Sequence, residues 1–415
     1  FGSGEQMPVI NGAELITGWE QHAADIYKVS LAIRPWVVIK NGEFLWSINN
    51  IDNLQPNRFH WDNTNQVLYI HSAGGNPDAL GLAIEAGQRN HGIEITAKPY
   101  VRVKGIRIEK TNSASILLRN NSHHAWIDSC HLRYANSGSV DGAGVHCNGN
   151  PYSRVSHTKI DTVLGDGVLV QASIHVSVEN CEINGIFRGK NSGGDGVQFF
   201  QSSHYARVLG TFISLNGTDV PKGCIQLDQP TDHALMSGNT LLYGNFGIGV
   251  NGSHCRIEKN YIAHQGIQSG DTWAAPLRFG GSLTGSADSE DNQFSYNVLV
   301  GSINYAMDIL DNNKHSNFHI LNNTVVKCLN GIKISGTVSG RLQNNLIWIP
   351  GGNNPLSVGS IITSEGWVSD YNLISPNYNK PTGRDENSIS QAPIFVDADQ
   401  DDYRLAAGSP GLTRG

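Results

Sequence analysis

The chain has 415 residues with a formal net charge of -7, and only 16% of its residues are charged whereas 47 are glycine. A length of this order allows two or three ordinary domains, although elongated all-β folds of the same length also form single units. No lysine or arginine run and no apolar stretch of membrane-spanning length occurs, so the sequence predicts neither nucleic acid nor membrane as a partner. Many glycines and few charges favour turn-rich β structure.

The N-terminal part of the chain differs from the remainder. Residues 1–16 are predicted to form a first-coil segment, and residues 17–85 a small inserted β subdomain. Strand-like runs and tight turns fill this second range, including the hairpin signal Asn41-Gly42. The ends of a repetitive fold need covering, so we expect this subdomain to cap the first coil.

Residues 86–350 contain an irregular repeat, and residues 351–415 are predicted to form a final coil and tail. The repeat is a hexad with apolar ends, such as "VENCEI", "IEKNYI" and "ILNNTV". Its fourth place always holds a small or amide residue, in the series Cys130, Thr158, Cys181, Thr211, Asn239, Asn260, Asn297, Asn323 and Asn345. These positions are 21 to 37 residues apart, which is typical of solenoid coils with variable loops.

Stacked coils would place the fourth-place residues in one column. At a strand spacing of roughly 4.8 Å, each asparagine amide can bond the next one and the local backbone. Several β-runs per coil without helical periodicity predict a parallel β-helix rather than a horseshoe or a propeller. The six cysteines form no CxxC pair, so we interpret them mainly as small buried packing residues.

The asparagine ladder, the strands "GDGV" and "GIKI" and the terminal "APIFVDADQDDYRLAAGSPGLTRG" resemble the right-handed parallel β-helix proteins. This superfamily includes pectate-lyase-like enzymes, glycoside hydrolases and phage tailspike depolymerases. The resemblance implies an all-β fold, a right-handed single-stranded parallel β-helix, in a protein that is secreted or lies on a cell surface or virion. It also implies a homotrimer if the chain is a tailspike. The fold hosts several chemistries, so the reaction stays open.

Alternation in the strand after each glycine turn predicts an outer face. With Val197 and Phe199 inward, Gln198 and Phe200 point outward. The same frame turns further polar residues outward in other coils, among them His146, Gln226, Asp228, Arg278, Asp308 and Lys333. We therefore expect one continuous groove that binds a polysaccharide or oligosaccharide.

The favoured function is glycosidic hydrolysis by paired aspartates. Asp195 and Asp228 are predicted as the acid and base, with carboxyls about 5 to 10 Å apart on consecutive coils. Asp166 and Asp308 are predicted helpers in this reaction. An aspartate before a strand also commonly caps its own turn, so a capping role for Asp166 and Asp195 stays open.

Substrate binding is assigned to other residues of the same face. The predicted set is His146, Gln198, Phe200, Gln226, Trp273, Arg278 and Lys333. Long loops at 185–194, 216–223, 265–275 and 280–292 are predicted to enter this face and to form its walls. Phe200 and Trp273 would stack on sugar rings, although Trp273 equally suits a packing role.

Two other classes of function remain. A polysaccharide lyase or uronate epimerase would use a Lys, Arg or His base, for which Arg278, Lys333 and His146 are the candidates. Calcium is expected only in this case, held by Asp228, Asp232 and Asp308; the hydrolase needs no metal. A non-catalytic glycan-binding protein or tailspike stalk is the third class.

Overall fold

The computed structural model describes residues 7–136, 142–187, 194–216, 222–228, 230–266, 274–280, 288–310, 314–335, 337–358, 366–378 and 385–412. The helical elements in these ranges are two short 3-10 helices, η1 (Ile51–Asn53) and η3 (Ala398–Gln400). No helix in the same ranges is long and apolar enough to cross a membrane. The predicted all-β class is confirmed.

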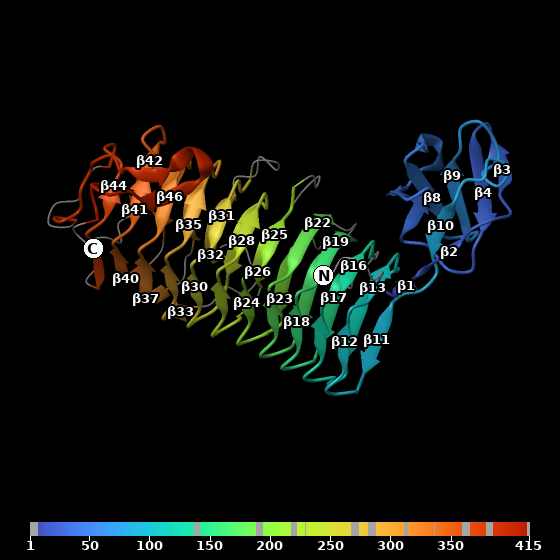
Figure 1. Ribbon diagram of the computed structural model, residues 1–415, viewed down its shortest axis with the longest axis horizontal. Helices are drawn as coiled ribbons and strands as arrows, with labels where there is room; N and C mark the ends of the chain where they lie inside the picture. The colour runs from blue at the N-terminus through green and yellow to red at the C-terminus, as the bar shows by residue number, and fades with distance from the viewer. Residues whose placement is uncertain are drawn as a thin grey trace.

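The dominant feature is a stack of coils, seen side by side along the long axis in Figure 1. Successive strands of the chain belong in turn to three parallel sheets, which we name sheets I, II and III. Each strand pairs in parallel with its counterpart one coil further on, as in Val168↔Val197 of sheet I. The predicted parallel β-helix is therefore confirmed.

The three sheets run the length of this stack. Sheet I consists of β11 (Ile93–Thr96), β14 (Ile116–Arg119), β17 (Ala143–Asn148), β20 (Asp166–Gln171), β23 (Val197–Phe200), β26 (Gly223–Leu227), β29 (Phe246–Val250), β32 (Ala275–Gly280), β36 (Tyr305–Leu310), β39 (Asn330–Ile334) and β42 (Asn354–Val358). Sheet II consists of β12 (Arg102–Lys104), β15 (Trp126–Asp128), β18 (Arg154–Ser156), β21 (Ser177–Glu179), β24 (Arg207–Leu209), β27 (Leu235–Ser237), β30 (Arg256–Glu258), β33 (Ser289–Glu290), β34 (Gln293–Ser295), β37 (Lys314–Leu321), β40 (Thr337–Gln343) and β43 (Trp367–Asp370). Sheet III consists of β1 (Val9–Asn11), β13 (Arg107–Glu109), β16 (His131–Arg133), β19 (Lys159–Leu164), β22 (Glu182–Phe187), β25 (Phe212–Ser214), β28 (Thr240–Leu242), β31 (Tyr261–Ala263), β35 (Val298–Val300), β38 (Thr324–Val326), β41 (Leu346–Trp348) and β44 (Leu373–Ile374).

Two smaller sheets precede the second coil, and Figure 1 shows them at the end of the solenoid opposite the C-terminal strands. One contains β3 (Glu20–Ala23), β4 (Ile26–Ser30), β9 (Val67–His71), β8 (Arg58–Asp62) and β7 (Trp46–Ile48). The other contains β2 (Ala13–Leu15), β10 (Ile84–Gly87), β5 (Val38–Lys40) and β6 (Glu43–Phe44). Asn41 and Gly42 join β5 to β6 with φ values of 49° and 84°, as a two-residue hairpin with left-handed central residues requires.

The small sheets also contact the side of the solenoid. Phe44 stacks on Tyr134 with ring centroids 6.4 Å apart, and Trp46 meets Phe187 edge-on at 5.1 Å. Tyr134 follows β16, and Phe187 ends β22 two coils later. The subdomain, predicted to be an end cap, thus also packs along a flank of sheet III.

At the other end, β45 (Phe395–Asp397) and β46 (Asp402–Leu405) form an antiparallel pair. Lys327 fixes this pair to the solenoid because its ammonium lies 3.5 Å from a carboxylate oxygen of Asp401. The Asp401 carboxylate also accepts a hydrogen bond from the Tyr403 hydroxyl at 2.6 Å.

The predicted column of nine fourth-place residues is confirmed, and all nine side chains are buried. The Asn260 amide donates to Asn297 at 2.9 Å, and the Asn297 amide donates to Asn323 at 3.0 Å. The column continues beyond its predicted end to Asn372, whose amide donates at 3.4 Å to buried Asp385. This extra coil holds the hexad "SDYNLI", so the ladder ends later than residue 350.

Glycines at the entry to sheet I explain the recurring "DG" and "FG" signals. A Cβ on Gly196 would lie 2.5 Å from the carbonyl oxygen of Cys224 and 2.6 Å from the Ile213 side chain. The equivalent Gly167 is blocked in the same way by the carbonyl of Gly196. These glycines are therefore required by contact between coils, because any side chain would overlap the next coil.

Candidate functional site

The predicted outward residues of sheet I form one continuous row. The strand register aligns His146, Leu169, Gln198, Gln226, Gly249, Arg278, Asp308 and Lys333 on successive strands. Val197 and Phe199, the inward residues of the reference strand, are fully buried in the core. The predicted inside and outside frame is therefore confirmed.

Most of this row is buried. His146, Gln226, Arg278 and Asp308 are between 2% and 7% exposed, while Gln198 and Lys333 are partly exposed. Alternation did not predict this burial, because it tells which side of the sheet a residue occupies and not what packs over that side. The row is a shielded polar strip, in which charges interact more strongly than in water.

Asp166 and Asp195 are buried where the chain enters sheet I. Asp166 is the first residue of β20, and one of its carboxylate oxygens accepts the backbone N–H groups of Gly194 at 3.1 Å and Asp195 at 3.0 Å. The Asp195 carboxylate accepts the N–H of Gly223 at 2.7 Å. Each aspartate thus caps the backbone of the following coil, rather than the turn of its own coil as sequence reasoning had considered.

Both carboxyls are buried, and burial changes their protonation. Desolvation, and after it the charge of Asp166, raises the pKa of Asp195 to about 7 against the opposing effect of Lys222. Desolvation also raises the pKa of Asp166 to about 6, against its hydrogen bond from the Asp195 backbone. Within the described residues, Oδ2 of Asp195 has no hydrogen-bond partner. Asp195 can therefore hold a proton close to neutral pH.

Asp228 lies at the opposite end of the neighbouring strand. It follows β26, and its backbone N–H donates to the carbonyl of Phe199 at 2.8 Å, whereas Asp195 caps the first residue of β26. The register therefore does not pair the two aspartates directly. The charge of Asp228 nevertheless contributes to the raised pKa of Asp195. Asp228 is partly exposed, so the two carboxyls occupy different environments.

A second group of charges lies further along the same row. Burial raises the pKa of Asp308, while Lys333 and Arg278 on the adjacent strands oppose that shift. The Lys333 ammonium is 3.6 Å from the Asp308 carboxylate and 5.1 Å from the centre of the Tyr305 ring. The structure thus brings together Arg278, Asp308 and Lys333, which were predicted to point outward from the same face.

The remaining predicted binding residues are distributed around the strip. His146 lies 3.3 Å from the amide oxygen of Gln171, and Phe200 is partly exposed at the end of β23. Trp273 lies outside the described residues, so its predicted stacking stays a prediction. The catalytic and binding roles assigned from sequence also stay predictions.

The predicted loop walls need one correction. The loop at 265–275 joins β31 to β32 and leads into sheet I, as expected. The loop at 280–292 follows β32 and leads out to sheet II, so it borders the other edge. The central parts of all four loops, at 188–193, 217–221, 267–273 and 281–287, lie outside the described residues.

Sequence reasoning missed Lys222 and Tyr305. Tyr305 begins β36 and, in the strand register, occupies the entry position that Asp166 holds in its own coil. Lys222 directly precedes β26, one residue before that position. Comparing the entry position in every coil therefore identifies Tyr305 but not Lys222. The three aspartates proposed for calcium do not gather: the described residues contain no group of three or more His, Cys, Asp or Glu that could hold a metal ion.

Comparisons with known proteins agree with this architecture. Residues 143–347 match the family model described as a right handed beta helix region. No curated protein matches the chain. The match thus covers the central coils and describes them as right-handed, and the strand pairing shows that they form a parallel β-helix.

Solved structures add the fold and nothing finer. XylC in complex with xylose is 9% identical, with a TM-score of 0.51 over 94% of this chain and 76% of that one. The Dettilon tailspike protein is 17% identical, with a TM-score of 0.44 over 73% of this chain and 59% of that one. Pectate lyase Pel9A is 12% identical, with a TM-score of 0.44 over 78% and 80%. The likeness to XylC is thus one of fold alone.

Proposed function

We propose that the protein cleaves a polysaccharide by glycosidic hydrolysis, with Asp195 as general acid. The observation that carries the proposal is the buried Asp166–Asp195 pair at the entry to sheet I. Hydrolysis of a glycosidic bond requires one carboxyl that keeps its proton and one that is ionised. Asp195 has the raised pKa suited to the first role. Asp228 supplies the nearby negative charge.

Asp166 has a supporting role in this proposal. Its carboxylate fixes the backbone of Asp195 through the bond to the Asp195 N–H. Its charge also helps to keep the proton on Asp195. Gln198 and Gln226 are next to each other in the outward row and would bond sugar hydroxyls, because an amide offers both donors and an acceptor.

The test is the chemistry of the products. The protein is incubated with xylan, polygalacturonate and hyaluronate, and both new reducing ends and ultraviolet absorption by unsaturated sugars are measured. Hydrolysis yields reducing ends without unsaturation. Reducing ends accompanied by unsaturation contradict the proposal, and so does the absence of any product.

A second candidate is uronate lyase chemistry, which the Arg278–Asp308–Lys333 cluster favours. Two cations beside one shielded carboxylate could neutralise a sugar carboxylate during proton abstraction. Unsaturated products that disappear in the Lys333→Ala variant would establish this candidate in place of hydrolysis.

A further inference from the structure

A column of stacked rings follows the turns between sheets I and II. It contains Tyr100, His124, Tyr152, His175, Tyr205, His233 and His254. Neighbouring centroids are 4.3 to 5.0 Å apart, close to the strand spacing. Every member has a left-handed φ between 57° and 61°. One turn geometry, repeated in seven coils, therefore aligns the rings.

Two residues after each ring, the chain enters sheet II. The residues at this position are Arg102, Trp126, Arg154, Ser177, Arg207, Leu235 and Arg256, consecutive partners in the strand register. Arginine thus recurs on every second strand. The first three arginines each follow a tyrosine of the ring column. The Cα positions of this arginine row are therefore about 10 Å apart, twice the strand spacing.

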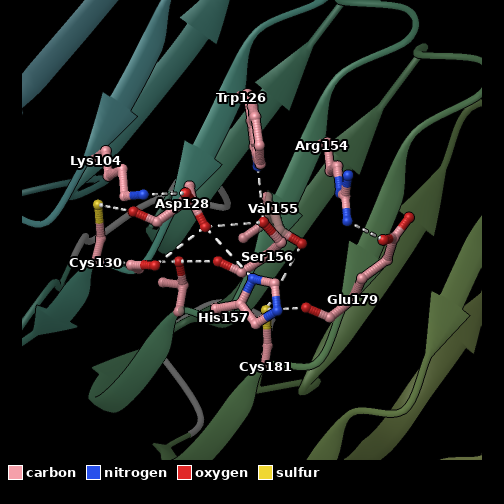
Figure 2. Close-up of polar contacts among 12 residues, drawn as sticks. Lys104, Trp126, Asp128, Cys130, Arg154, Val155, Ser156, His157, Glu179 and Cys181 are labelled. Atoms are coloured by element: carbon pink, nitrogen blue, oxygen red, sulfur yellow. Dashed lines mark hydrogen bonds and ion pairs between the residues drawn. The ribbon is translucent and has the colours of Figure 1, made fainter. Parts of the chain in front are cut away.

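Carboxylates hold several of these arginines in place, as Figure 2 shows for Arg154 and Glu179. Arg102 bonds Asp128 at 2.6 Å and lies 3.7 Å above the Trp126 ring. The Asp128 side chain is 5% exposed, whereas that of Arg102 is 44% exposed. At this pair the surface therefore presents the guanidinium N–H groups more than the carboxylate.

Arg207 has a different environment. The next residue on its side of the strand is Leu209 rather than an acid. Within the described part of the chain, no carboxylate lies within ion-pair distance of Arg207, and its side chain is exposed. A guanidinium carries five N–H donors, so Arg207 offers an open binding position in the middle of the row.

We propose that the ring column and the arginine row form a binding surface for a linear acidic polysaccharide with one anionic group per disaccharide. A spacing of about 10 Å, taken as two strand spacings, is of the order of the length of two linked pyranose rings. Guanidinium groups bind carboxylates and sulfates. The ring edges present hydroxyl and imidazole groups to the neutral sugars between them.

The sparse charge favours a polysaccharide over a nucleic acid. Duplex DNA carries one charge per roughly 1.7 Å of its axis, so many phosphates would face no cation on this row. The carboxylates paired with the arginines, Asp128, Glu179 and Glu258, would repel such a dense array. This surface belongs to sheet II, so it does not depend on the proposed hydrolysis at sheet I.

The experiment measures binding of hyaluronate, which has one carboxylate per disaccharide, by affinity electrophoresis. Dextran is the neutral control, and Asp195→Asn protein is used in parallel. Arg207→Gln should weaken binding about threefold, within the range of one exposed ion pair. The matched control is Arg341→Gln, an exposed residue in the same row of sheet II but beyond the ring column.

The proposed binding surface is supported if Asp195→Asn retains hyaluronate binding, Arg207→Gln weakens it and Arg341→Gln leaves it unchanged. The proposal is overturned if dextran retards the protein as much as hyaluronate does, if the two arginine variants have equal effects, or if hyaluronate does not bind at all. Stronger binding of duplex DNA than of hyaluronate at equal charge concentration also overturns it. Absence of hydrolysis by the parent protein with intact hyaluronate binding would contradict only the proposed function.

Discussion

Replacing Asn297 by leucine tests the asparagine ladder. The Asn297 carbonyl oxygen accepts the backbone N–H of Asn260 at 3.1 Å, and its amide donates to the carbonyl of Ile257 at 2.8 Å. Leucine has a similar size but makes neither bond. Two buried backbone groups would lose their partners at about 1–3 kcal/mol each. We expect the free energy of unfolding to fall by about 2–6 kcal/mol.

Urea unfolding followed by circular dichroism measures this loss. The matched control is Asn184→Leu on sheet III, where the partly exposed amide donates to the Glu182 carboxylate at 2.8 Å. A surface change of this kind should alter stability by at most about 0.5 kcal/mol. Equal stability losses in the two variants would refute the reasoning that the ladder satisfies buried groups.

The remaining predictions concern the entry to sheet I. Gly196→Ala should clearly lower the midpoint of thermal unfolding, because the added Cβ would lie 2.5 Å from the Cys224 carbonyl oxygen. Gly351→Ala, whose Cβ would have no atom within 4 Å, should leave the midpoint unchanged. Equal midpoints of the two variants would contradict the steric argument. The pKa values of Asp166 and Asp195 are raised to about 6 and 7, so the folded chain binds more protons than the unfolded chain. The stability that these two aspartates contribute is therefore largest at low pH and is lost as the pH rises through 4 to 7. Asp195→Asn should flatten the decrease in urea midpoint over that range, and an unchanged slope would contradict the assigned burial.

The sequence allowed prediction of the features that repeat. Asn239 and Asn345 can be recognised because each coil needs an amide at the same buried place, and Val197 and Phe199 follow from alternation. Asn372 was missed because its hexad lies beyond the assumed end of the repeat. Repetition thus predicts interior positions well, including residues whose spacing along the chain is irregular.

The candidate site was only partly predictable. Asp195 was singled out from its place between glycines, but its bond to Gly223 crosses between coils, and no local pattern encodes such a contact. The near-complete burial of Arg278 and Asp308 depends on parts of the chain that alternation does not describe. The ring column is encoded as Tyr or His two residues before seven successive strands of sheet II, from β12 to β30.

The most direct test of the proposed hydrolysis compares Asp195→Asn with Asp161→Asn in the release of reducing ends from the polysaccharide that the parent protein cleaves. Asparagine keeps an oxygen for the Gly223 N–H but cannot act as an acid. Asp161, paired with His131 on sheet III at 2.5 Å, is the control. The account predicts at least a hundredfold or so loss of turnover for Asp195→Asn with an unchanged unfolding midpoint at pH 5, and normal turnover for Asp161→Asn. Parental turnover in the Asp195→Asn variant would contradict it.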